Sequence, residues 1–223
     1  MLLRPRASTV ANVASRRTHP REPALAQYRR RARLYDLELA AFEPVRRRVV
    51  RALALGKGQT VLDVACGTGL SFPLLAPLVG PRGRVVGIEQ SPEMMAQARR
   101  RVQGAGWRQV RLLEAAAESA PLEGKADAAL FMFTHDVLQS EAALAHLLAH
   151  LKPGAHVAAA GLQWAPPWAL PLNLFVLGAA LYSVTTLQGL DQPWARLARH
   201  LTGLQVQSLW GGAVYLASGR VRQ

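Results

Sequence analysis

Two acids and a run of small residues form the most specific chemical pattern in this chain. Asp63 lies near the end of the apolar stretch 60–64, and the turn Ala-Cys-Gly-Thr-Gly, residues 65–69, follows directly. Small side chains there let a ligand approach the backbone and the amino end of the next helix. Glu89 ends the next apolar stretch, 20 residues beyond Gly69, where a carboxylate can accept both hydroxyls of a ribose. The pattern therefore predicts a nucleoside-binding site.

Phe72 indicates which kind of nucleoside the site would bind. A dinucleotide-binding turn carries a third glycine at this position, because the pyrophosphate lies hard against the helix. A bulky aromatic side chain there argues against NAD or FAD.

These residues must be positioned by alternating strands and helices. Strands are predicted at 60–64, 84–88, 110–113, 128–133 and 156–160, and helices at 70–79, from Ser91 onward, and at 141–151. Such alternation indicates a parallel α/β sheet with helices on both faces. Residues 204–209 and 213–217, joined by Trp210-Gly211-Gly212, read as a hairpin, so the sheet should end in an antiparallel strand. The turn Lys152-Pro153-Gly154 is expected to precede the fifth strand.

The length and the charge distribution of the chain limit its possible domain organisation. The 223 residues suit one domain, residues 25–223, which starts with helices at 25–55 and follows a disordered basic tail, residues 1–24. The net charge is +13, and 13 arginines against four acids give residues 1–51 a charge of +9. Clustered arginines can bind an anionic surface such as lipid head groups or nucleic acid, or they can do no more than keep the protein in solution. Both interpretations stay open.

Two further features bear on location. Cys66 is the only cysteine, so no intramolecular disulfide can form, and a cytoplasmic setting is the default. The Arg-rich opening resembles an organelle transit peptide in composition, but a disordered tail is the favoured interpretation. Residues 164–184 carry no charge and are long enough on hydropathy to span a membrane. Three prolines and Asn173 in their first half favour a cap over a pocket, within residues 162–190, or an interfacial helix.

In these motifs the chain resembles the class I S-adenosylmethionine-dependent methyltransferases. It is most similar to the group that contains the quinone-biosynthesis and phospholipid N-methyltransferase-like (methyltransferase type 11-like) enzymes. The resemblance rests on VLDVACGTG at 61–69, VVGIEQSPEMMAQAR at 85–99, LKPGAHVAAAG at 151–161 and the terminal hairpin. It implies a Rossmann-like three-layer sandwich with a seven-stranded, mostly parallel sheet that includes an antiparallel C-terminal hairpin strand.

The resemblance also implies the cofactor, S-adenosyl-L-methionine, and residues that would hold it. Its methionine part would lie against Asp63, Ala65, Cys66, Gly67 and Gly69, its ribose on Glu89, and its adenine beside Gln90. The third motif matches at Ala117 and Glu118, Phe133 matches the segment that passes the sulfonium, and Tyr35 with Asp36 matches a pair that closes over the cofactor. Two positions depart from the family: Ala65 replaces the first glycine, and Ala116 replaces the aspartate that commonly faces the adenine amino group.

His135 is the candidate general base. It follows the fourth predicted strand at the carboxyl end of the sheet, where such sheets bind ligands, and Asp136 could orient it. In the alternative, His135 only shapes the pocket and Asp136 caps the next helix. No metal site is expected, because the buried leucine stripe of the 141–151 helix leaves His146 and His150 on its wet face.

The predicted reaction is methyl transfer to a small, lipophilic or aromatic acceptor beneath the apolar segment. The alternatives are a non-catalytic interaction protein with this fold, and a phospholipid head-group N-methyltransferase in peripheral contact with the membrane. The sequence argues against a nucleic-acid acceptor, because FMFTHDVL, residues 131–138, has neither the Asn/Asp-Pro-Pro-aromatic run nor the Pro-Cys pair of base methyltransferases. The acceptor itself and the oligomeric state do not follow from the sequence.

Overall fold

The computed structural model describes residue 36 and residues 39–222, apart from the side chains of residues 182 and 183. The predicted basic tail, Tyr35 and the first part of the predicted N-terminal helices lie outside these residues. The division into a tail, residues 1–24, and a domain, residues 25–223, therefore stays a prediction.

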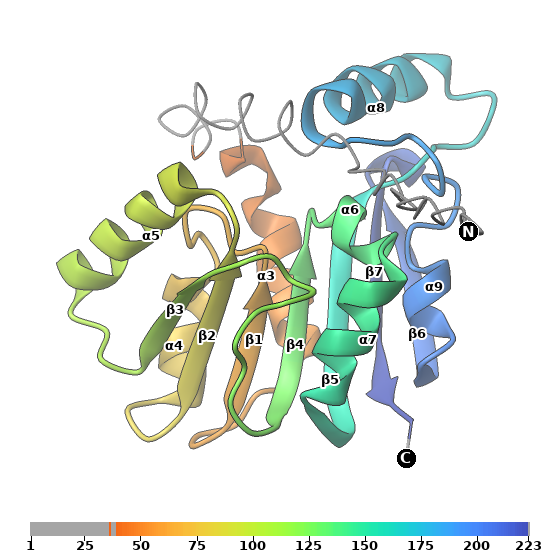
Figure 1. Cartoon of the computed structure of the whole chain (residues 1–223). Helices are drawn as coiled ribbons and strands as arrows, with labels where there is room; N and C mark the ends of the chain where they lie inside the picture. Colours follow the sequence, from red (N-terminus) through yellow and green to blue (C-terminus); the bar gives the residue numbers. More distant parts are fainter. Residues whose placement is uncertain (1–35, 37–38, 223) are drawn as a thin grey trace, which may run out of the picture.

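A seven-stranded sheet forms the centre of the molecule (Figure 1). Its strands are β1 (Thr60–Val64), β2 (Arg84–Glu89), β3 (Val110–Glu114), β4 (Ala126–Met132), β5 (Leu151–Leu162), β6 (Leu201–Leu209) and β7 (Val214–Val221). Their order across the sheet is β3-β2-β1-β4-β5-β7-β6. The first five are parallel, and β7 lies antiparallel between β5 and β6. The predicted fold class and the terminal hairpin are confirmed.

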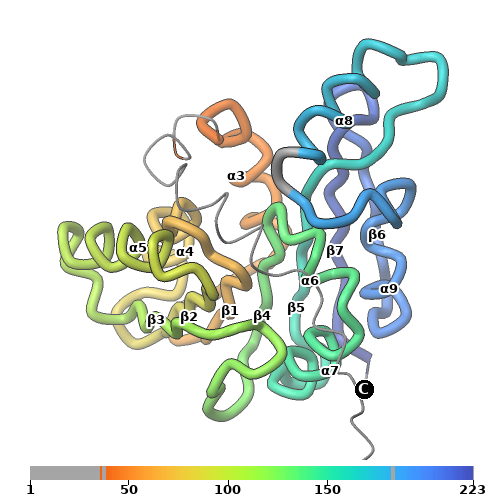
Figure 2. The backbone as a smooth tube through the Cα atoms, turned by 45° about the horizontal axis from the view of Figure 1, so that its top comes forward, coloured from red at the N-terminus to blue at the C-terminus, as the bar shows by residue number. Residues whose placement is uncertain are grey.

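Helices cover both faces of the sheet, which gives three layers (Figure 2). One face packs against α3 (Glu43–Ala52), α4 (Phe72–Val79) and α5 (Pro92–Ala105). The other packs against α6 (His135–Leu138), α7 (Glu141–Ala149) and α9 (Ala195–Ala198). Short 3-10 turns, η1 (Ala40–Phe42) and η2 (Trp210–Gly212), precede α3 and join β6 to β7.

Side chains alternate between these two faces along β1. Leu62 and Val64 belong to the core beneath α6 and α7, whereas Val61 belongs to the core beneath α3 and α4. Because successive strand residues point to opposite faces, Asp63 points toward the same layer as Val61. The acid therefore faces α3 and α4.

The local signals for helix starts were reliable. The hydroxyl of Ser91 accepts a hydrogen bond from the Met94 amide at 3.3 Å, which caps α5 as the Ser-Pro-Glu run predicts. Pro73 lies in the first turn of α4, although that helix begins at Phe72 rather than at residue 70.

The fifth strand differs from the prediction. Lys152-Pro153-Gly154 does not precede β5 but lies within it, because Leu151 already pairs with Ala126. The next pair is Ala128 with His156, so the intervening residues leave the ladder as an irregularity, and Gly154 has a φ of 75°.

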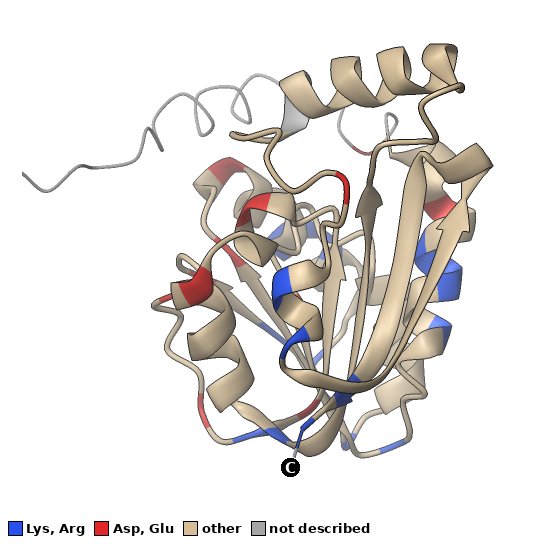
Figure 3. Ribbon diagram, turned by 90° about the vertical axis from the view of Figure 1, so that its right-hand side faces the viewer, with Lys and Arg blue, Asp and Glu red and all other residues tan. Residues whose placement is uncertain are grey.

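The apolar segment forms α8 (Leu170–Ser183), which lies along the top of the molecule and carries no charged residue (Figure 3). Its 14 residues span about 21 Å at a rise of about 1.5 Å per residue. Among the described residues, no helix is both long enough and apolar enough to cross a membrane.

Candidate functional site

The turn after β1 adopts the backbone conformations that its small residues allow. Ala65 has a φ of 48°, Gly67 a φ of 57° and Gly69 a φ of 80°. Cys66 donates its amide to the carbonyl oxygen of Ile88 at 2.9 Å, so the turn stays joined to the end of β2. Left-handed backbone is least costly for glycine, which has no Cβ, and a small side chain such as that of Ala65 crowds it least among the other residues. This explains the predicted run of small residues and places it at the carboxyl edge of the sheet.

The ring of Phe72 fills the space beneath this turn. The side chain is fully buried, and a Cβ added to Gly69 would lie 2.4 Å from its Cε2 atom. A Cβ on Gly87, in β2, would lie 2.8 Å from the Cζ atom of the same ring. The two glycines therefore make room for phenylalanine at the place where a dinucleotide site needs a third glycine.

Glu89 joins the end of β2 to the turn. Its Oε2 atom accepts a hydrogen bond from the Gly67 amide at 3.0 Å, and its Oε1 atom accepts one from the Ser91 amide at 2.8 Å. The residue is 8% exposed. Burial raises the pKa of the carboxyl above its ordinary value, and the donated backbone N–H groups oppose that rise. Glu89 therefore has a fixed position from which spare lone pairs can accept further hydroxyl donors.

Asp63 lies at the carboxyl end of β1 and is 1% exposed. Its Oδ2 atom is buried and has no hydrogen-bond partner. Burial raises the pKa of the carboxyl from 3.8 to about 7, the charge of Arg46 lowers it, and the charge of Glu89 raises it. A buried carboxylate oxygen without a donor is costly, so this atom marks a position where a cationic or N–H donor would be stabilised.

Asp36 lies against the outer side of the turn. One carboxylate oxygen accepts a hydrogen bond from the Thr68 hydroxyl at 2.5 Å, and the other forms an ion pair with Arg101 of α5. Arg101 also donates to the carbonyl oxygen of Thr68 at 2.9 Å. Sequence reasoning included Asp36 but missed Arg101, because nothing in its helical position distinguishes it from neighbouring surface arginines.

An aromatic cluster lines the next part of the edge. Phe133, directly after β4, has a φ of 58°. Its ring meets Phe42 edge-on, with centroids 4.7 Å apart, and Phe42 in turn stacks on Trp210 at 4.6 Å. The start of the apolar segment adjoins this cluster, because a Cβ on Gly211 would lie 2.9 Å from Leu172. Sequence analysis identified Phe133 but missed Phe42 and Trp210, which come from η1 and η2.

His135 and Asp136 take different partners. The Nε2 atom of His135 lies 3.0 Å from the carbonyl oxygen of Gln188, and its Nδ1 atom is buried without a partner. The Asp136 carboxylate accepts from the Thr185 amide at 3.1 and 3.3 Å. Asp136 therefore anchors the chain that returns from α8, and its hydrogen bonds hold that chain rather than the imidazole. The catalytic role of the two residues stays a prediction.

The other predicted residues surround the same turn. Gln90 is exposed after β2, and Ala117 is buried in the loop that follows β3. The amide of Ala115 donates to the carbonyl oxygen of Glu89 at 3.0 Å, which places the third motif beside the ribose-binding candidate. Burial raises the pKa of the Cys66 thiol well above its usual range. A thiol that stays protonated is a poor nucleophile, which agrees with a packing role.

His146 of α7 and His150, directly after that helix, both contact backbone carbonyl oxygens. His146 Nε2 lies 2.9 Å from the carbonyl oxygen of Ala120, and His150 Nδ1 lies 2.8 Å from that of His146. Both are half-buried rather than fully wet. In the described part of the chain, no group of three or more His, Cys, Asp or Glu side chains could hold a metal ion.

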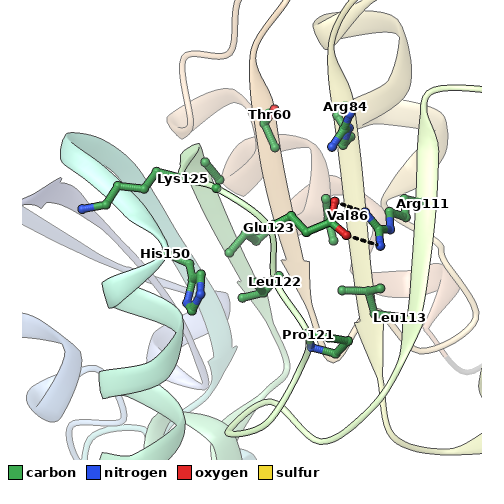
Figure 4. Close-up of a pocket in the computed structure, with 13 residues that line it drawn as sticks. Thr60, Arg84, Val86, Arg111, Leu113, Pro121, Leu122, Glu123, Lys125 and His150 are labelled. Atoms are coloured by element: carbon green, nitrogen blue, oxygen red, sulfur yellow. Dashed lines mark hydrogen bonds and ion pairs between the residues drawn. The ribbon is translucent and has the colours of Figure 1, made fainter.

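A separate cavity of about 130 Å³ lies on the face of the sheet opposite to Asp63, where Leu62, Val86 and Leu113 line it (Figure 4). It is lined by residues near the amino ends of the strands, such as Thr60 and Arg84, and by the loop between β3 and β4. Glu123 from that loop forms two hydrogen bonds with Arg111, at 2.7 and 2.9 Å. Ligands of open α/β sheets bind at the carboxyl ends of the strands, so the Asp63–Glu89 edge, and not this cavity, is the candidate site.

Residues 61–154 match the family model described as the methyltransferase domain. Over these residues the chain is similar to methyltransferase domains. The matched residues run from β1 into β5, so the match includes Asp63, the small-residue turn, Glu89 and His135.

Curated relatives match parts of the chain. An uncharacterised 37.1 kDa protein in transposon TN4556 of Streptomyces fradiae is 38% identical over 51% of this chain and 33% of its own length. The demethylmenaquinone methyltransferase of Bacillus cytotoxicus is 36% identical over 35% of this chain and 33% of its own. The trans-aconitate 2-methyltransferase of an Azoarcus strain is 34% identical over 53% of this chain and 47% of its own length. The chain thus covers about a third to a half of the length of these relatives.

Solved structures share the fold over more of the chain. The N-methyltransferase NodS from Bradyrhizobium japonicum, in complex with S-adenosyl-l-homocysteine, matches with a TM-score of 0.67 and 17% identity, over 90% of this chain and 99% of its own. A SAM-dependent methyltransferase from Aquifex aeolicus matches with a TM-score of 0.58 and 24% identity, over 88% of this chain and 98% of its own.

The residues present fit S-adenosylmethionine. The positive φ angles of Gly67 and Gly69 bring bare backbone to the carboxyl edge of the sheet. Asp63 offers an unpartnered oxygen to an ammonium group, and Glu89 offers fixed carboxylate oxygens to ribose hydroxyls. When bound, the cofactor supplies a methyl group already activated by its sulfonium. Ala116, half-buried in the loop after β3, provides no side-chain acceptor for an adenine amino group.

Proposed function

We propose that the protein transfers a methyl group from S-adenosylmethionine to a small lipophilic or aromatic acceptor. The acceptor would lie between the Phe42–Phe133–Trp210 cluster and the start of the apolar segment. The observation that carries this proposal is the aromatic cluster itself, which continues the nucleoside-binding edge from β4 toward α8. Stacked and edge-on rings favour flat or apolar ligands.

In this function the chain mainly positions and shields the acceptor. An activated sulfonium needs alignment more than further activation, so fixed geometry is the principal catalytic device. Phe133 is held between the end of β4 and Phe42, and its left-handed backbone fixes the direction of the ring. The rings and the segment before α8 would exclude water from the reacting atoms.

His135 has the arrangement of a general base for an oxygen or sulfur acceptor. Its Nε2–H donates to the Gln188 carbonyl at 3.0 Å, which leaves Nδ1 as the unprotonated nitrogen. Burial lowers the pKa of the imidazole, against opposing effects of the Gln188 carbonyl and the Asp136 charge. The neutral ring can therefore take the proton that leaves the acceptor as its new bond to the methyl carbon forms.

A second candidate function is methyl transfer to a phospholipid head group at a membrane surface. The observation that favours it is the outer side of the apolar segment, where Trp168 is 81% exposed and Leu170, Leu174 and Leu181 are 63% exposed or more. Helices that lie in the plane of a lipid interface bury exposed aromatic and aliphatic side chains at the boundary between head groups and acyl chains.

The test is transfer of a labelled methyl group by the full chain to a panel of acceptors. Phenols, quinols, thiols and amines of similar size are compared with phosphatidylethanolamine vesicles. Label on an aromatic or lipophilic small molecule supports the first proposal, and label on the head group alone supports the second. Tight binding of S-adenosylmethionine without label on any acceptor would favour the non-catalytic interaction protein and contradict both.

A further inference from the structure

Arg46 is a buried arginine near the amino end of α3. Its side chain is 3% exposed, whereas that of its neighbour Arg47 is 60% exposed. Arginine is rarely buried unless it is paired. One partner is Glu43, whose Oε2 atom lies 2.6 Å from Nη1 of Arg46. The Nε atom is buried and has no partner, so this guanidinium retains an N–H donor that its own helix does not satisfy.

The fold directs this donor toward the candidate site. Helix α3 runs opposite to the parallel strands, so its amino end lies near their carboxyl ends (Figure 1). Helical side chains lean toward the amino end of their helix. Arg46 therefore extends toward the site, while Val45 and Val49 pack into the core beneath the helix.

Asp63 faces the same layer. It alternates with Leu62 along β1 and pairs in register with Leu130 of β4, a strand that α3 contacts. The charge of Arg46 lowers the pKa of Asp63, which agrees with a guanidinium close to the carboxyl. Within the described residues, however, Arg46 forms its ion pair with Glu43 and not with Asp63. Nε of Arg46 and Oδ2 of Asp63 are both left without a partner.

Two buried groups of opposite charge, each with an unpartnered atom, complement a zwitterion. The amino-acid end of the cofactor has this chemistry, with an ammonium and a carboxylate on one carbon. We propose that Arg46 binds this α-carboxylate while Asp63 binds the α-ammonium. The proposal rests on the proposed function and adds to it a specificity residue from α3, outside the matched residues 61–154. A purely structural Arg46 would instead only offset the charge of Asp63.

Calorimetry with two probes separates these roles. The probes are S-adenosylhomocysteine and its decarboxylated analogue, which keeps the ammonium and lacks the carboxylate. Wild type should bind S-adenosylhomocysteine at least about tenfold more tightly than the analogue, because a charge-assisted hydrogen bond is among the stronger ones. Arg46→Gln should lose about tenfold for S-adenosylhomocysteine and less than about twofold for the analogue. Arg47→Gln is the matched control, since Arg47 contacts the same Glu43 at 3.0 Å from an exposed position, and it should bind both probes as wild type does.

Three results would overturn the proposal. If wild type binds the two probes with equal affinity, no contact to the carboxylate exists, and this result does not depend on how any variant folds. It leaves the proposed function intact. Equal weakening of both probes by Arg46→Gln, in a variant that melts like wild type, assigns Arg46 a structural role. If wild type binds neither probe, the proposed function fails and the assignment of Arg46 fails with it.

Discussion

Replacing Asp63 by asparagine should stabilise the ligand-free protein, and more so as the pH rises. The carboxyl is 1% exposed, and burial raises its pKa from 3.8 to about 7. Below pH 3.8 the group is protonated in both the folded and the unfolded chain and does not affect stability. As the pH rises toward 7, the unfolded chain releases its proton first, so the free energy of unfolding of wild type falls.

The size of the effect follows from the two pKa values. They differ by about 3 pH units, and each unit corresponds to about 1.4 kcal/mol. Ionised Asp63 therefore lowers the stability of the folded wild type by about 4 kcal/mol above pH 7, and about 2–3 kcal/mol of this develops between pH 5 and pH 8. Asparagine has nearly the same shape and does not ionise, so the Asp63→Asn variant lacks this loss.

Urea denaturation followed by tryptophan fluorescence, at pH 5 and at pH 8, measures the difference. The advantage of Asp63→Asn over wild type should grow by about 2–3 kcal/mol between the two pH values. Asp191→Asn, at an exposed position, is the control and should show a difference that does not change with pH. A pH-independent difference for Asp63→Asn would refute the raised pKa of Asp63 and the picture of a desolvated acid awaiting a donor.

Three further predictions follow from the packing and the site. Gly87→Ala should lower the free energy of unfolding by about 1–3 kcal/mol in urea denaturation, because the new Cβ would lie 2.8 Å from Phe72. Gly104→Ala is the control and should not lower the free energy of unfolding, because a Cβ there would have no atom within 4 Å. Trp210→Ala should raise KM for an aromatic acceptor at least about fivefold without changing the dissociation constant of S-adenosylhomocysteine; an equal change in both would remove Trp210 from the acceptor pocket. His135→Gln should lower kcat for an oxygen or thiol acceptor about 100-fold. The wild-type rate should fall only below pH 6.5, because burial lowers the pKa of His135 from that value, and a variant with unchanged kcat would exclude a general base here.

Much of the framework could be predicted because its signals are local. The Ser91 hydroxyl caps α5, and the left-handed turn after β1 needs small residues; both depend on a few consecutive positions. The placement of Asp63 and Glu89 at one edge follows from parallel pairing of β1 with β2. Once the alternation of strands and helices is recognised, this edge is determined by topology.

The rest depends on contacts between distant parts of the chain. Phe42 and Trp210 meet Phe133 only because η1 and η2 are brought to the same edge. Arg46 lies among surface arginines in sequence, and its burial depends on how α3 packs on β4 and β5. Asp136 was assigned to His135 by adjacency, but it binds Thr185 after α8. Periodicity describes one element at a time and carries no information on such partners.

The most direct test of the central claim is calorimetric titration with S-adenosylmethionine and S-adenosylhomocysteine, of wild type and Glu89→Ala. Glu114→Ala is the matched control, because Glu114 pairs in register with Glu89 from the end of β3 and binds Arg99 at the surface. A lost contact from ribose to carboxylate should weaken binding at least about tenfold. The account predicts micromolar binding by wild type and Glu114→Ala, and at least tenfold weaker binding by Glu89→Ala. Equal affinities for Glu89→Ala and wild type, or no binding of either nucleoside by wild type, would contradict it.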